Sequence, residues 1–159
     1  MSTGRISGVN SPAATVATAA DWPEVLAVRT RVFVQEQGVP AELEHDDRDA
    51  TAVHVLSRDG AGTVVATGRL LPDAAGPGTA VVGRMAADAA VRGRGHGAAV
   101  LGVLEREAAA RGQSAVELHA QATARGFYER AGYAVVGEPY QEVGIAHVTM
   151  RKRLAPGRV

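Results

Sequence analysis

Hydrophobic and polar residues follow two different periods along this chain. Between residues 114 and 120 they alternate, which is typical of a β-strand with one buried face. One face of that strand carries Val116, Leu118 and Ala120, and the other carries Glu117, His119 and Gln121. After residue 99 the apolar positions recur every three or four residues, as on one face of a helix. They are Val100, Leu101, Leu104 and Ala108.

The same reading along the chain predicts an alternation of strands and helices. Strands are expected over residues 14–18, 51–57, 63–71, 80–87, 114–120, 133–136 and 145–150. Helices are expected from Asp21 to the region of Gly38, from the glycine-rich turn to Gly112, and over residues 122–131. Asp21 is expected to cap the first helix, with Glu24 three residues on as in a capping box. The order β-α-β-β-β-α-β-α-β-β predicts an α/β (α+β) fold, a mixed sheet with helices on its faces.

Composition limits the classes of function. The 159 residues suit one domain, and 17 basic residues balance 17 acidic ones, so we expect neither a nucleic-acid nor a membrane partner. With no cysteine, the chain cannot form a cysteinyl acyl-enzyme or a thiolate metal site. The N-terminus lacks the pattern of a signal peptide, which favours the cytoplasm. We expect a disordered segment over residues 1–12, a domain over 13–154 and a tail over 155–159, and residues 151–153 to be a solvated basic end.

A glycine-rich turn is expected between the fourth strand and the second helix. Gly93, Gly95 and Gly97 alternate there with Arg92, Arg94 and His96. Glycine lets a backbone approach a ligand closely, and the N–H groups at a helix N-terminus attract anions. The arginines add charge that suits phosphate. The stretch therefore predicts a site for a phosphorylated cofactor.

The spacing of the glycines narrows the choice of cofactor. A dinucleotide fingerprint requires Gly-x-Gly-x-x-Gly and a nucleotide-triphosphate loop requires Gly-Lys-Ser/Thr, and neither is present. Arg92, Gly95 and Gly97 instead fill the pattern Arg/Gln-x-x-Gly-x-Gly/Ala. This pattern resembles the coenzyme A pyrophosphate loop of the GNAT N-acyltransferases.

A second motif lies one strand further on. Residues 124–133, Ala-Arg-Gly-Phe-Tyr-Glu-Arg-Ala-Gly-Tyr, are similar to the C-terminal GNAT motif, a helix that carries a tyrosine. Residues 29–38, 83–84, 120–121 and 138–147 are similar to the ElaA-like branch of that family. The resemblance spans roughly Val16 to Arg153. It implies a single-domain GNAT fold with a mixed, mostly antiparallel central sheet, and an acetyl-CoA-dependent N-acetyltransferase.

The resemblance also implies roles for individual residues. Tyr128 matches the group that protonates the departing thiolate, and His119 is our first choice for the base that deprotonates the amine. The cofactor would be bound by Met85, Ala86, Ala87, Arg92, Gly93, Arg94, Gly95, His96, Gly97, Ala98 and Gln121. The acceptor would be bound by Glu36, Arg69, Arg84, Glu117 and His147. Many family members have Asn, which contacts the cofactor, where this chain has Gln121. Several members have a catalytic Glu at the position of Val116. Because Glu117 lies beside that position, Glu117 is the alternative base.

Several alternatives stay open at this stage. The chain could bind acyl-CoA without turnover, as a sensor, or it could hold another phosphorylated cofactor. We expect the acceptor to be a primary amine of a small molecule or a peptide, and a small amine, a polyamine, a peptide terminus and an antibiotic all stay open. A homodimer is compatible with the sequence. The acidic residues 41–50 include a His-Asp-Asp cluster, which we interpret as a solvated loop because it lacks the spacing of metal ligands. We expect no metal.

Overall fold

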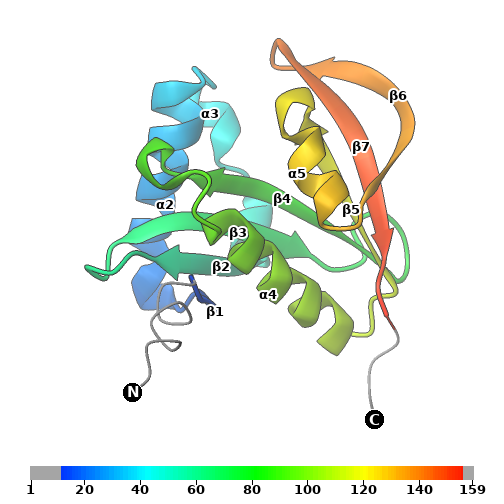
Figure 1. Ribbon diagram of the computed structural model, residues 1–159, viewed down its shortest axis with the longest axis horizontal. Helices are drawn as coiled ribbons and strands as arrows, with labels where there is room; N and C mark the ends of the chain where they lie inside the picture. Colours follow the sequence, from blue (N-terminus) through cyan, green and yellow to red (C-terminus); the bar gives the residue numbers. More distant parts are fainter. Residues whose placement is uncertain (1–11, 156–159) are drawn as a thin grey trace, which may run out of the picture. The chain divides into compact units, whose positions relative to one another are not determined.

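The computed structural model describes residues 12–155 of the chain; the predicted segments 1–12 and 155–159 lie almost entirely outside that range (Figure 1). The strands are β1 (Ala14–Val16), β2 (Val53–Arg58), β3 (Val64–Leu71), β4 (Thr79–Ala87), β5 (Ala115–Gln121), β6 (Ala134–Glu142) and β7 (Ile145–Arg153). The α-helices are α2 (Trp22–Arg29), α3 (Ala41–Glu44), α4 (His96–Ala110) and α5 (Arg125–Arg130). A π-helix, η2 (Thr30–Glu36), continues α2, and short 3₁₀ segments are η1 (Ala19–Asp21), η3 (Asp47–Ala50), η4 (Ala89–Val91) and η5 (Ala122–Ala124).

The seven strands form one mixed sheet in the order β1-β2-β3-β4-β5-β7-β6. β4 and β5 pair in parallel, whereas β1 pairs with β2, and β7 with both β5 and β6, in antiparallel fashion. The predicted fold class and the predicted order of strands and long helices are confirmed. In the described part of the chain, no helix is long and apolar enough to cross a membrane.

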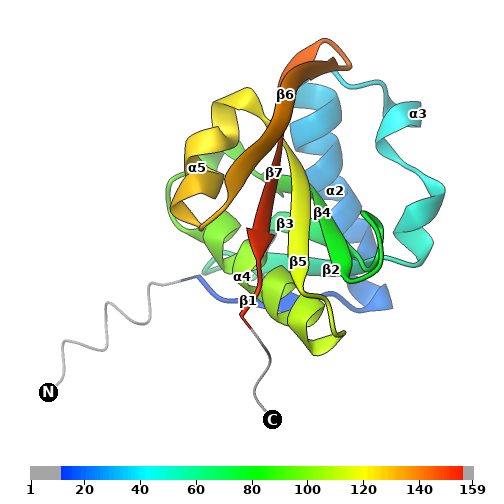
Figure 2. The same cartoon turned by 90° about the vertical axis from the view of Figure 1, so that its right-hand side faces the viewer.

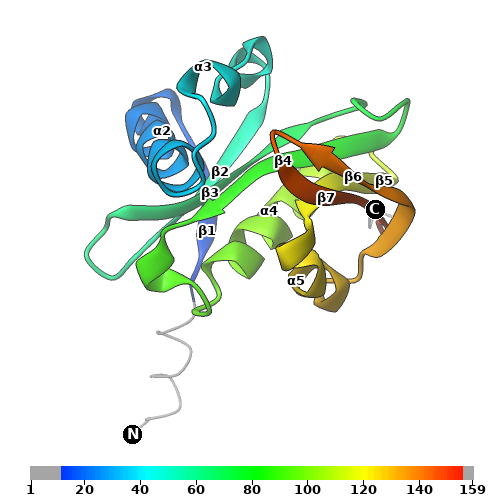
Figure 3. The same cartoon turned by 90° about the horizontal axis from the view of Figure 1, so that it is seen from above.

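The described residues divide into two compact units. The first contains residues 12–46, 53–68 and 84–103. In it α2 and η2 pack against the sheet: Val25, Val28 and Val32 form a buried cluster with Leu56 and Val64. Figure 3 shows α2 on one face of β2 and β3. These helix residues are spaced by three and four, so the apolar period that predicts the helix also marks its buried face.

The second unit contains residues 47–52, 69–83 and 104–159 of the chain as far as they are described. Here β5, β7 and β6 lie side by side (Figure 2). Val116, Leu118 and Ala120 are buried, and Glu117, His119 and Gln121 occupy the opposite, more exposed face, as the alternation predicts. The alternation therefore places the two candidate bases on one face of β5.

Four local predictions are wrong. Asp21 stands at the N-cap position of α2, but its side chain does not cap that helix: its carboxylate accepts the Thr18 N–H at 2.8 Å, in the capping box of η1. Residues 137–142 continue β6 instead of forming a loop, because the turn to β7 needs only Val143 and Gly144, both at positive φ. Residues 41–50 form α3 and η3, with Glu44 buried.

The fourth wrong prediction concerns residues 151–153, which belong to β7 instead of a solvated tail. Arg151 donates to Glu117 at 2.7 Å, and Lys152 donates to Glu105 at 3.1 Å and to the Ala131 carbonyl at 2.9 Å. Local sequence shows a cluster of positive charge, and only the fold supplies the carboxylates that pair with it.

Candidate functional site

The glycine-rich turn has the backbone geometry that an anion site requires. Gly93 and Gly95 have φ of 82° and 93°, a region that side chains disfavour. α4 begins at His96, and the N–H of Ala99 makes the first helical hydrogen bond, to Gly95 O at 3.0 Å. As in any α-helix, the preceding N–H groups have no partner within the helix, and the helix dipole adds positive charge there. The turn can therefore hold a phosphate group.

The side chain of His96 is buried in the first unit. Its Nδ1 lies 2.7 Å from the hydroxyl of Ser57, which is fully buried on β2. His96 can thus contribute its backbone N–H to an anion, while its imidazole anchors the first turn of α4 to the sheet.

The end of β4 has an irregular backbone. The register of β4 with β5 covers Thr79 to Val82, and the strand continues to Ala87 beyond that paired segment. Arg84 has a φ of 52°, which is rare for a residue with a side chain and marks local strain. The predicted cofactor residues Met85, Ala86 and Ala87 follow it directly, in a segment whose backbone could pair with an extended ligand.

Arg92 and Glu36, predicted for different ligands, contact each other. The two terminal nitrogens of Arg92 each donate to one oxygen of Glu36, both at 2.6 Å, and Arg92 Nε donates to the Ala87 carbonyl at 3.0 Å. The hydrogen bond from Arg92 holds the pKa of Glu36 below its ordinary value. Arg94 is exposed.

Tyr128 lies in α5, in the second unit. It is buried, and its ring meets Phe127 and Tyr133 edge to face at centroid distances of 4.9 and 5.9 Å. Burial raises the pKa of the Tyr128 hydroxyl well above its ordinary value, so the group keeps its proton at neutral pH. A neutral hydroxyl of this kind can act as a proton donor.

His119 belongs to a polar cluster on the exposed face of β5, β7 and β6. Its Nδ1 lies 2.8 Å from the Tyr140 hydroxyl and 3.3 Å from the Thr149 hydroxyl, and its Nε2 lies 3.6 Å from a Glu117 oxygen. Glu117 also accepts from Arg151. Burial raises the pKa of Tyr140, so its hydroxyl stays protonated. Contacts at both ring nitrogens therefore fix the orientation of the His119 ring.

The remaining predicted residues of the second unit lie on β7, β5 and β3. His147 is buried, contrary to the alternation that predicts it exposed opposite Val148; its Nδ1 lies 2.7 Å from Ile145 O and its ring stacks on Tyr140. It also faces Gln121 in the β5–β7 register. Arg69 is buried and donates to Asp49 at 2.8 Å.

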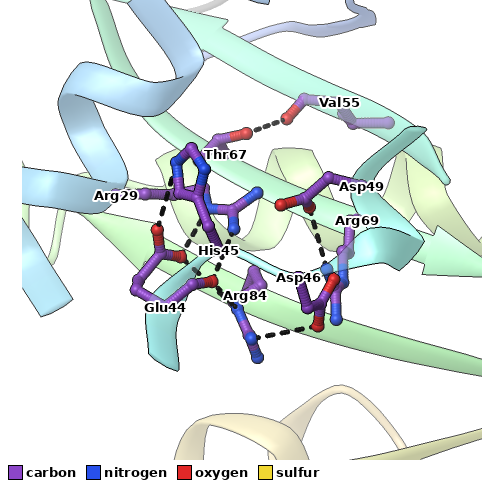
Figure 4. A network of polar contacts seen from close by, with 9 residues as sticks. All are labelled: Arg29, Glu44, His45, Asp46, Asp49, Val55, Thr67, Arg69 and Arg84. Atoms are coloured by element: carbon purple, nitrogen blue, oxygen red, sulfur yellow. Dashed lines mark hydrogen bonds and ion pairs between the residues drawn. The ribbon is translucent and has the colours of Figure 1, made fainter. Parts of the chain in front are cut away.

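A buried ion pair in the first unit is absent from the sequence predictions. Arg29 Nε donates to Glu44 at 2.6 Å (Figure 4), and both side chains are almost inaccessible. The Arg29 guanidinium also lies 5.7 Å from the centre of the Trp22 ring. Arg84 donates to the Glu44 carbonyl at 3.1 Å and to Asp46 at 3.3 Å. The only sequence signal was an arginine on the apolar face of a predicted helix.

Three members of the His119 cluster were also missed: Tyr140, Thr149 and Arg151. Tyr140 lies in the family-like stretch 138–147, which indicated importance without a role, and Thr149 alternates with buried Val148 and Met150. Across residues 12–155 there is no group of three or more His, Cys, Asp or Glu side chains that could hold a metal ion.

Comparison with known proteins assigns this arrangement to a family. Residues 18–154 match the model of the acetyltransferase (GNAT) domain. The chain is 36% identical over 126 residues to the uncharacterized N-acetyltransferase YjcF of Bacillus subtilis, covering 79% of this chain and 87% of that protein. It is 31% identical over 132 residues to the protein ElaA of Escherichia coli, covering 82% and 86% of the two chains.

Solved structures agree with this assignment. A Lactobacillus plantarum structure superimposes with a TM-score of 0.82 at 32% identity, covering 92% of this chain and all of that one. The crystal structure of Escherichia coli ElaA gives a TM-score of 0.77 at 26% identity, covering 89% and 99%. The fold is thus that of a GNAT acetyltransferase. The chain belongs to the GNAT acetyltransferase family, as a member of its ElaA-like branch.

Proposed function

We propose that this protein transfers the acetyl group of acetyl-CoA directly to a primary amine of a small molecule or a peptide. The observation that carries the proposal is the turn of Gly93 and Gly95 at the start of α4, whose backbone N–H groups and helix dipole suit the pyrophosphate of coenzyme A. The backbone of Met85, Ala86 and Ala87 would pair with the pantetheine arm, and the Gln121 amide would contact it.

The reaction needs one proton acceptor and one proton donor. An alkyl amine with a pKa of about 10.4 is protonated at neutral pH and must lose a proton before it attacks the thioester. We assign that proton to His119, whose ring is fixed by Tyr140 and Glu117. As the new carbon–nitrogen bond forms, the carbon–sulfur bond breaks and the thiolate of coenzyme A leaves. Tyr128, kept neutral by burial, donates a proton to this thiolate, and the second proton that the nitrogen loses on becoming an amide restores the Tyr128 hydroxyl.

The remaining parts of the proposal rest on the family pattern. The family pattern makes the following residues the candidates for binding the acceptor: Glu36, Arg69, Arg84, Glu117 and His147. We place the catalytic domain at residues 13–154 and the protein in the cytoplasm. No metal takes part in the proposed reaction, because the base and the acid are both side chains.

Two measurements test the proposal. Coenzyme A should raise the melting temperature by an amount that grows as RT ln(1 + [L]/Kd), and NAD or ATP should raise it less. Acetyl-CoA with a panel of primary amines should release a free thiol. Binding without thiol release for any amine would favour the acyl-CoA sensor, and equal protection by NAD would contradict the cofactor assignment.

Variants of one glycine separate charge from strain. Gly95→Asp adds a carboxylate at the pyrophosphate turn and should abolish protection by coenzyme A. Gly95→Asn places an uncharged side chain of the same size as Asp at the same positive φ. It should therefore retain part of the protection by coenzyme A. Gly60→Asp is the matched control, because a Cβ at Gly60 meets no atom within 4 Å. It should bind coenzyme A as the wild type does.

A further inference from the structure

Two ion pairs connect the π-helix η2 to the segment between β4 and the glycine turn. Arg31 donates to both oxygens of Asp88, at 2.8 and 2.9 Å. Arg92 donates to both oxygens of Glu36, each at 2.6 Å. Both pairs have the parallel two-bond geometry that gives arginine–carboxylate contacts their strength and directionality. The positive partner is on η2 in one pair and on the turn segment in the other.

Further contacts fix both ends of the turn segment. The N–H of Asp88 donates to Val65 O on β3 at 2.9 Å, and Arg92 Nε donates to the carbonyl of Ala87, the last residue of β4. Arg92 therefore contacts η2 and β4 at once, immediately before Gly93. The π-helical form of η2 is uncommon and is frequently associated with functional sites in proteins.

We propose that Arg92 is a positioning residue that holds the glycine turn in its binding geometry through Glu36, and that the backbone of the turn, instead of the Arg92 guanidinium, binds the pyrophosphate. This inference rests on the proposed binding of coenzyme A. To bind a phosphate through the same two-bond face of its guanidinium, Arg92 would have to leave Glu36. That movement would break two short charge-assisted hydrogen bonds and leave a carboxylate unpaired near an anion site.

The two roles of Arg92 make opposite predictions for Glu36→Gln. If Glu36 holds Arg92 in place, this variant loosens the turn and coenzyme A binds more weakly. If Arg92 is a phosphate ligand that Glu36 competes for, the same variant releases Arg92 and coenzyme A binds as well or more tightly. The variant leaves the size of residue 36 unchanged, so packing does not decide the sign.

The experiment is titration calorimetry of coenzyme A with wild type, Glu36→Gln, Arg92→Gln and the charge-swapped double variant Glu36→Arg/Arg92→Glu. We expect each single variant to weaken binding about two- to fivefold, as for loss of an exposed ion pair. The double variant should bind more tightly than Arg92→Gln, because the pair is re-formed with its charges exchanged. Asp88→Asn, in the companion pair, should also weaken binding, and it provides a second test should the double variant not fold.

Three results would overturn the inference. They are unchanged or tighter binding by Glu36→Gln, a double variant that binds more weakly than Arg92→Gln, and a loss of tenfold or more in Arg92→Gln alone, as expected for a lost charged ligand. A wild type that binds no coenzyme A would refute the proposed function and this inference together. A wild type that binds, with Glu36→Gln unaffected, would refute the positioning role alone.

Discussion

The Tyr140 hydroxyl lies 2.8 Å from Nδ1 of His119, and this hydrogen bond joins two strands, β6 and β5, that are not neighbours in the sheet. It crosses β7, where the Thr149 hydroxyl also reaches His119. We expect the plot of kcat/KM against pH to have a rising limb, because the amine must lose a proton to a base before it attacks the thioester. His119→Ala should remove this limb and lower kcat about a hundred- to ten-thousand-fold, with coenzyme A affinity unchanged. Tyr140→Phe should keep the limb and lower kcat by a smaller factor.

The control for this prediction uses two amines of different basicity. A limb that follows the amine's own pKa in wild type and in His119→Ala would mean that solvent removes the proton. A limb that survives in His119→Ala but is lost in Glu117→Gln would assign the base to Glu117.

Tyr128 and Tyr133 form a matched pair for the proton donor. Tyr128→Phe removes only a hydroxyl, so binding of acetyl-CoA should persist while kcat falls about a hundred- to ten-thousand-fold. Tyr133 donates its hydroxyl to Glu105 at 2.8 Å, so Tyr133→Phe should cost about 1 kcal/mol of stability and leave kcat nearly unchanged. Steady-state kinetics and urea unfolding measure both effects. Equal kcat in wild type and Tyr128→Phe would restrict Tyr128 to packing.

Neutralising Glu44 in its buried pair with Arg29 should lower the free energy of unfolding more than neutralising a residue of an exposed ion pair. Glu44→Gln leaves a buried guanidinium without its carboxylate, and we expect a loss of about 3–5 kcal/mol in the free energy of unfolding. Glu129→Gln breaks the exposed pair with Arg125 within α5 and should cost less than about 0.5 kcal/mol. Urea unfolding of the two variants measures the difference, and similar losses would contradict the prediction.

Alkaline pH should destabilise the protein through the same two tyrosines. Burial raises the pKa of Tyr128, and burial together with Glu105 raises the pKa of Tyr133. Above pH of about 10 the unfolded chain loses these protons while the native state keeps them, so the free energy of unfolding falls as pH rises. Each tyrosine contributes a slope approaching about 1.4 kcal/mol per pH unit.

Urea unfolding at pH 9, 10 and 11 measures this slope in wild type and in Tyr133→Phe. The variant should show the shallower fall, because one of the two protons is no longer involved. An identical pH dependence in both proteins would show that Tyr133 ionises equally in the folded and unfolded states.

The sequence by itself determined the order of strands and long helices, the glycine turn before α4, and the faces of β5. Each depends on residues close together in the chain: a period of two or of three to four, or glycines at adjacent positions. The motif around Tyr128 could be found in the same way, and the family was recognised from it together with the turn. The sequence also showed which charged residues were candidates.

Only the tertiary structure decided how those charges are used. Glu36 and Arg92 are 56 residues apart and were predicted to bind different ligands, yet they bind each other. Arg29 is buried on a helix because Glu44, 15 residues away, meets it in a segment predicted to be a solvated loop. Tyr140 contacts His119 because β6 extends through a predicted loop. The period of apolar positions along the chain predicts which face of an element a side chain lies on. Its partner depends on which distant segments the fold brings together, and the local sequence does not contain that information.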